Sequence, residues 1–113
     1  MTRLLIENQD EKNVKNEHGL TPLHYAAGKG YLKVCEILIE NGVDKNVEND
    51  FGNTPLHMAA QSGKSRICKF FVEKGVNVNS RNNNYNTARD LASFAGHVQV
   101  FNYLRNLRIR PLQ

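Results

Sequence analysis

The sequence has no tryptophan, only two cysteines, and no apolar run near the roughly 18 residues that a membrane-spanning helix requires. Cys35 and Cys68 are too few for the disulfide framework of a small secreted protein. No Asn-x-Ser/Thr acceptor for glycosylation occurs, although asparagine is abundant. The apolar stretch near the N-terminus, Leu4-Leu5-Ile6, is too short for a signal peptide. We therefore expect an intracellular protein, cytoplasmic or nuclear, without a membrane span.

Motifs for catalysis are also missing. The sequence contains no glycine-rich phosphate loop, no nucleophile elbow and no pair of carboxylates placed for acid–base chemistry. The spacing of its cysteines and histidines fits no zinc pattern. We therefore expect no enzymatic activity, no catalytic residue, no cofactor and no bound metal.

What the sequence does contain is a block of residues that returns at a fixed distance. Thr21-Pro22-Leu23-His24 recurs 33 residues later as Thr54-Pro55-Leu56-His57, and a weaker copy, Thr87-Ala88-Arg89-Asp90, follows at the same distance. Glycines and pairs of small residues keep this spacing: Gly30, Gly63 and Gly96, and Ala26-Ala27, Ala59-Ala60 and Ala92-Ser93. Such a period is typical of a solenoid of stacked helical units, which offers a long, shallow surface.

Each unit predicts two short helices. Thr21 can cap a helix that starts at Pro22 and runs to about residue 29, because threonine accepts a bond from the helix N-terminus and proline suits the first turn. A second helix, with an apolar stripe at helical spacing, is expected over residues 32–41. Gly42 can end it in the left-handed conformation. The polar residues 43–52 then suit a hairpin loop. The predicted fold class is all-α, a solenoid of helix-turn-helix units joined by hairpin loops.

These boundaries divide the chain into four parts. Residues 16–48 and 49–81 are complete units, and 82–113 form a third. In the third unit Leu107-Arg108 stands where the first has Asn41-Gly42, so we expect its last helix to continue until Pro111. Its polar side predicts a C-terminal capping unit, because a terminal repeat must face water.

Residues 1–15 align with the second half of a preceding unit whose first helix is absent. The apolar edge Leu4-Leu5-Ile6 then lacks its usual cover. Three interpretations stay open: the chain is part of a longer array, another surface packs there, or this is a short native cap. Self-association through this edge is a further hypothesis.

The repeated unit resembles the ankyrin repeat. The resemblance covers nearly the whole chain and depends on residues 19–27 (GLTPLHYAA), 52–60 (GNTPLHMAA), 38–44 and 71–79. The third copy departs from it, since Tyr85 replaces the loop glycine and Asp90 the histidine, which puts its hairpin geometry in question. The resemblance implies an L-shaped stack of inner helices, outer helices and hairpins. It also implies a non-enzymatic module that binds a protein partner.

Partners of this family usually meet the hairpin tips and the exposed side of the inner helices. Transferred by position, the expected tip residues are Glu17, His18, Asp50, Phe51, Asn83 and Asn84. The expected inner-helix residues are Tyr25, Lys29, Met58, Gln61, Leu91 and Phe94, with Leu20 and Asn53 beside them. Several are large and apolar where the scaffold requires nothing apolar, which is typical of an anchoring surface. For Tyr25 and Leu91 the alternative is packing against the neighbouring inner helix.

His24 and His57 occupy equivalent positions at helix starts. We interpret them as structural residues that bond the backbone between hairpin and helix. Cys35 and Cys68 are likewise equivalent and are expected in the core, too far apart for a disulfide.

Other functions stay open. The net charge is +4 and the isoelectric point about 9.2. We interpret Arg105, Arg108 and Arg110 first as a solvated helix end. The alternative is a basic C-terminal surface for nucleic acid or anionic lipid, although nucleic acid is not the expected partner. The high asparagine content is compatible with an AT-rich genome and hence with a host-directed effector scaffold. A purely structural spacer is the remaining alternative.

Overall fold

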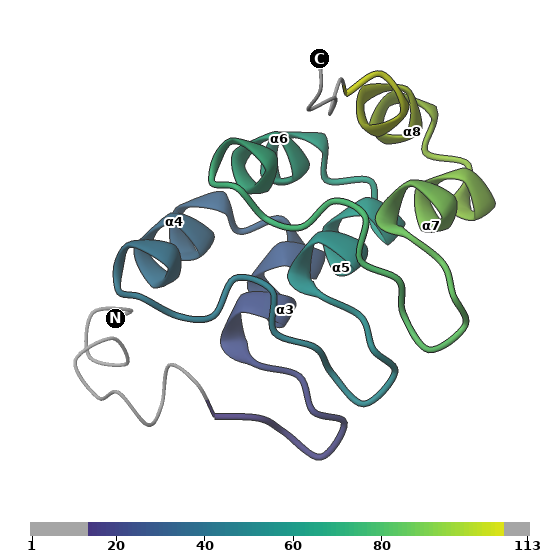
Figure 1. Ribbon diagram of the computed structural model, residues 1–113. Coiled ribbons are helices and arrows are strands. Elements are labelled where there is room, and N and C mark those ends of the chain that lie inside the picture. Colours follow the sequence, from purple (N-terminus) through teal and green to yellow (C-terminus); the bar gives the residue numbers. More distant parts are fainter. Residues whose placement is uncertain (1–13, 108–113) are drawn as a thin grey trace.

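Six α-helices form a stack of three pairs in the computed structural model, which describes residues 14–107 (Figure 1). The inner helices are α3 (Pro22–Lys29), α5 (Pro55–Gln61) and α7 (Ala88–Ala95). The outer helices are α4 (Leu32–Glu40), α6 (Ser65–Glu73) and α8 (Val98–Arg105). No strand occurs within these residues, and the hairpin loops project from the same side of the stack. The predicted all-α solenoid is therefore confirmed. The predictions for residues 1–13, including the Leu4-Leu5-Ile6 edge, and for Arg108 and Arg110 lie outside the described residues.

The inner helices begin where the threonines predict. Thr21, Thr54 and Thr87 are extended N-cap residues, and each side chain accepts a hydrogen bond from the N–H three residues later. The side chain at that third position bonds back to the threonine N–H, which closes a capping box. In the third unit Asp90 takes this role, since its Oδ2 accepts from the Thr87 N–H at 3.0 Å. Replacing histidine by aspartate therefore preserves the helix start.

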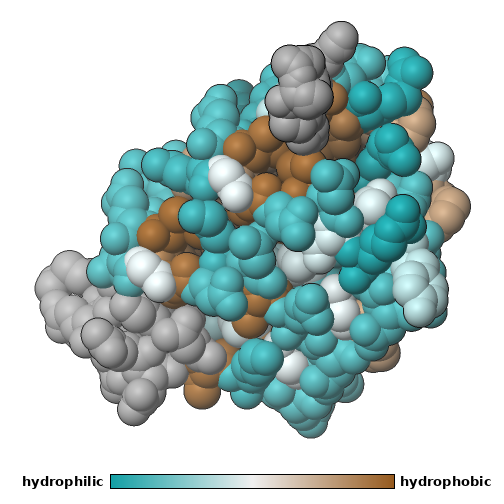
Figure 2. Space-filling view, viewed as in Figure 1, coloured by the Kyte–Doolittle hydropathy of each residue, from teal (hydrophilic) through white to brown (hydrophobic). Residues whose placement is uncertain are grey.

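The core lies between and within the two rows of helices. α3 packs beside α5, and α5 packs beside α7. Buried alanines, among them Ala27 and Ala60 at 0% exposure, allow this close approach. Phe71 at the centre of the stack is also fully buried. Figure 2 shows hydrophobic residues (brown) in patches between the helix rows, surrounded by a largely hydrophilic surface.

The cysteines are core residues, as predicted. Cys35 and Cys68 are fully buried and free. Burial raises the pKa of each thiol to about 12, so both stay protonated near neutral pH. They contribute as small apolar side chains.

All three hairpins contain the same type of turn, which was not predicted from the sequence. An asparagine starts each turn, and its side-chain oxygen accepts bonds from the N–H groups two and four residues later: Asn16, Asn49 and Asn82. The turn places Gly19 and Gly52 at φ of 78° and 77°. Tyr85 adopts φ of 65° at the same position, so the third hairpin keeps the geometry of the other two.

The last helix is shorter than expected. α8 ends at Arg105, and the Leu107 N–H bonds to the Leu104 carbonyl at 3.4 Å in a tighter turn. This turn packs Leu107 against the core. The expectation of a helix that continues through Leu107 toward Pro111 is therefore wrong.

Candidate functional site

The hairpin tips form a continuous ridge because their backbones bond to one another. The Asp50 N–H donates to the His18 carbonyl at 3.1 Å, and the Asn83 N–H donates to the Phe51 carbonyl at 3.0 Å. The Asn83 side chain adds a bond from Nδ2 to the Asp50 carbonyl at 3.0 Å. Each tip is thereby held in register with the next. The ridge is a rigid support for the side chains that project from it.

One buried histidine on each of the first two inner helices, α3 and α5, fastens that helix to the following hairpin. The His24 Nδ1 accepts from the Thr21 N–H at 3.1 Å, and its Nε2–H donates to the Asn53 carbonyl at 2.8 Å. His57 makes the equivalent bonds to Thr54 and to the Asn86 carbonyl. Because Nδ1 accepts a backbone N–H, the proton is on Nε2. The structural interpretation of both histidines is confirmed.

Burial lowers the pKa of both histidines below their ordinary value of 6.5, even though the bonds to Asn53 and Asn86 act in the opposite direction. The protonated ring would also lose the acceptor that the threonine N–H requires. The folded state therefore takes up a second ring proton on His24 and His57 less readily than the unfolded state does.

We expect the stack to become less stable as the pH falls below 6.5. Because the pKa of each histidine is lowered in the folded state, the neutral rings contribute their full stabilisation above pH 6.5. This stabilisation is lost as the pH falls from 6.5 toward the pKa values of the folded state. Thermal unfolding at about pH 7.5 and about pH 5.5 tests this, with a lower melting temperature expected at the acid value. From about pH 7 to 8 this contribution should stay constant. A melting temperature that rises on acidification from 7.5 to 5.5 would refute the assignment.

Among the exposed aromatic side chains of the inner helices and hairpins, Tyr25 and Phe51 lie on the first two units. Tyr25 on α3 is 57% exposed and Phe51 on the second tip is 60% exposed. The Lys29 ammonium lies 5.7 Å from the Tyr25 ring centroid. Tyr31 packs edge-on against the same ring at 6.3 Å. These contacts hold Tyr25 in place without burying it, as an anchoring residue requires.

A shallow hollow of about 250 Å³ adjoins Tyr25 between α3 and α5. Met58 and Leu20, both half-buried, form part of its lining. Gly28 also contributes, because the absence of a side chain there leaves the inner-helix surface open. The site is therefore an open surface rather than an enclosed pocket. It suits an apolar side chain of a larger partner.

The other predicted residues differ in their exposure. Those with exposed side chains are Glu17, His18, Lys29, Asp50, Gln61, Asn83, Asn84 and Phe94. Glu17 and His18 approach within 3.6 Å of each other. Asn53 is half-buried and its groups bond within the protein, to Asn49, His24 and Asn82.

Leu91 does not fit the expected exposed surface. It is only 8% exposed, because α7 packs against both α5 and α8 and burial of a leucine side chain is favourable. The alternative prediction, that these residues pack against the neighbouring inner helix, is thus correct for Leu91. It is wrong for Tyr25, which is exposed. Tyr31, half exposed beside Tyr25, belongs to the site but was not predicted, because the turn after Gly30 carries no periodic apolar signal.

Among residues 14–107, no group of histidine, cysteine, aspartate and glutamate side chains is arranged to hold a metal. None of the helices in this part of the chain is long and apolar enough to cross a membrane. Neither finding adds a chemical function to the surface described above.

The sequence matches the model of a known protein family. The family model described as "Ankyrin repeats (3 copies)" matches residues 1–49 and 39–112. No curated protein matches the sequence.

Proposed function

Because this chain belongs to the ankyrin repeat family, whose members are generally protein–protein interaction modules and typically not enzymes, we propose that it binds a protein partner through one defined surface. We call this the concave surface: the hairpin tips at residues 17–18, 50–51 and 83–84, together with the exposed side of α3 and α5. The observation that carries the proposal is the exposure of Tyr25 and Phe51, 57% and 60%, on a scaffold that does not need them for packing.

The physical argument is one of preorganisation. Backbone bonds between tips and the histidine bonds to the hairpins fix the surface before a partner arrives. Binding then orders few side chains, so the loss of conformational entropy is small. Aromatic anchors on such a surface supply a large part of the binding energy. Lys29 and Asp50, of opposite charge, supply a means to select the orientation of the partner.

The test begins with affinity capture using this chain as bait and continues with the purified partner. In the double variant Tyr25→Ala/Phe51→Ala we expect the Kd to rise by about 30-fold or more, equivalent to about 2 kcal/mol. The melting temperature should stay nearly unchanged, because both side chains are exposed. Isothermal titration and thermal unfolding measure the two effects.

Val98→Ala provides the matched control, since Val98 is 65% exposed but lies on the outer helix α8. It should bind as the unmodified chain does. Equal Kd values for the double variant and the control would refute the proposal that the partner binds at the concave surface. An unfolded double variant would place Tyr25 and Phe51 in the core and refute it as well.

The basic C-terminal surface stays a second hypothesis for this chain. Of its three arginines only Arg105 lies among the described residues, where its guanidinium is 5.8 Å from the Phe101 ring centroid. Self-association through Leu4-Leu5-Ile6 and an intracellular location also stay predictions.

A further inference from the structure

The third unit carries arginines where the other two units carry core residues. Leu23 and Leu56 are 1% and 2% exposed, whereas Arg89 occupies the equivalent position and is exposed. Arg105 likewise stands at the position of Val72, which packs against the core. Two apolar positions on one side of the third unit have therefore become cationic.

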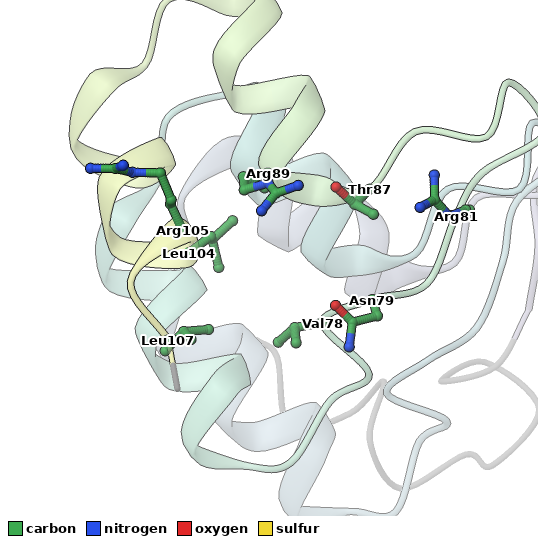
Figure 3. A pocket seen from close by; sticks show the side chains of 8 residues that line it. All are labelled: Val78, Asn79, Arg81, Thr87, Arg89, Leu104, Arg105 and Leu107. Carbon is green, nitrogen blue, oxygen red and sulfur yellow. The ribbon is translucent and has the colours of Figure 1, made fainter. Parts of the chain in front are cut away.

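These arginines line a hollow of about 340 Å³ at the end of the stack (Figure 3). The hollow lies between the loop at residues 78–81, α7 and the end of α8. Arg81, Arg89 and Arg105 contribute to its wall, as do Asn79 and Thr87. No carboxylate is among the described residues that line it. We call it the arginine pocket.

The arrangement of the guanidinium groups favours a small anionic group. The Arg81 Nη1 donates to the Tyr85 carbonyl at 2.8 Å, which fixes this side chain at the edge of the pocket. Figure 3 shows the Arg89 guanidinium directed toward Thr87 and the Arg81 side, while that of Arg105 points away, over Phe101. A guanidinium offers five N–H donors in a planar fork, so Arg81 and Arg89 keep donors for an oxyanion.

The last unit of the stack must present polar residues to water, which explains why its surface is polar. It does not explain why three arginines line one hollow. The nearest carboxylate along α7, Asp90, is occupied by the Thr87 N–H at 3.0 Å. The positive charge of the arginine pocket is thus left without an internal counterion among its lining residues. Bidentate bonds from arginine to phosphate or carboxylate are among the strong ones in proteins.

We propose that the arginine pocket binds an oxyanion, a phosphate or carboxylate group, carried by a protein partner. The partner class rests on the proposed protein-binding function, but the pocket is separate from the concave surface. A protein is favoured over a nucleic acid because the described arginines gather around one hollow, whereas a nucleic acid needs a basic stripe that follows successive phosphates.

The test is a titration of the full chain with inorganic phosphate, and separately with acetate, at constant ionic strength and followed by NMR. Saturable shifts should be confined to residues 78–81, 87–89 and 104–107, the segments that line the pocket. Arg89→Leu, which restores the residue of the other units and keeps the fold, should weaken binding by about tenfold or more. Arg66→Leu, at an exposed arginine on α6, should leave it unchanged.

The phosphate and acetate titrations distinguish the two kinds of oxyanion that a protein partner can carry. Tighter binding of phosphate supports a phosphorylated side chain, and equal or tighter binding of acetate supports a carboxylate. Small shifts spread over all basic residues, or equal affinities for Arg89→Leu and the unmodified chain, would overturn the proposal. Salt-sensitive binding of duplex DNA that Arg89→Leu weakens would overturn the protein partner in favour of nucleic acid. Because the probes are ions, these failures leave the concave surface untouched.

Discussion

Replacing Phe71 by alanine should lower the free energy of unfolding by about 3–5 kcal/mol. Phe71 lies on α6 of the middle unit, is fully buried and packs against Phe70 with ring centroids 5.9 Å apart. Its removal opens a cavity at the centre of the stack, where both neighbouring units lose contacts. The loss is a large part of the about 5–15 kcal/mol that stabilises an ordinary domain.

Urea denaturation followed by circular dichroism measures this effect. Phe94→Ala is the matched control, because Phe94 is 72% exposed and should change stability by less than about 0.5 kcal/mol. A loss of less than about 1 kcal/mol in Phe71→Ala would show that the middle unit does not depend on this packing.

The second large effect is expected at a hairpin glycine. Gly52 has φ of 77°, and an added Cβ would lie 2.5 Å from Asn83 Oδ1 and 2.8 Å from Asn83 N. Gly52→Ala should cost more than about 2 kcal/mol, since a left-handed alanine alone costs about 1–2 kcal/mol and the clash disrupts the bond between neighbouring tips. Urea denaturation again gives the change in free energy.

Tyr85→Ala is the informative comparison, because Tyr85 holds the same turn position at φ of 65° but is 75% exposed. We expect this variant to lie within about 0.5 kcal/mol of the unmodified chain. In this account the close approach of Asn83, and not the turn itself, requires glycine at position 52. Similarly small changes in the free energy of unfolding for both variants would contradict it.

Most of the fold follows from local chemistry that repeats along the sequence. Threonine at each helix start and glycine at Gly30 and Gly96 fix where the inner helices begin and end, and these signals need no knowledge of packing. The end of α8 was not predictable in this way. Its turn depends on the packing of Leu107 against the core, which is a tertiary contact.

The third hairpin shows a similar limit. The absence of glycine at Tyr85 suggested a different geometry, yet Asn82 bonds the N–H groups of Asn84 and Asn86 as its counterparts do. These local bonds hold the turn despite the cost of a left-handed tyrosine. The repeated asparagines were visible in the sequence, but their role depends on side-chain geometry.

The candidate site was predictable in position but not in detail. The period located the tips and the inner-helix face, and Tyr25 and Phe51 are exposed there. The period alone cannot decide exposure, because Leu91 occupies the same place as Tyr25 in its unit and is buried. The arginine pocket was missed for a related reason, since the replacement of leucine by Arg89 is visible in sequence while the hollow around it is not.

The most direct test of the concave surface is hydroxyl-radical footprinting of the chain with and without its captured partner. The account predicts that binding lowers oxidation at Tyr25, Phe51 and Met58 and leaves Tyr103 on α8 unchanged. Lower oxidation at Tyr103, with Tyr25 and Phe51 as reactive as in the free chain, would contradict it.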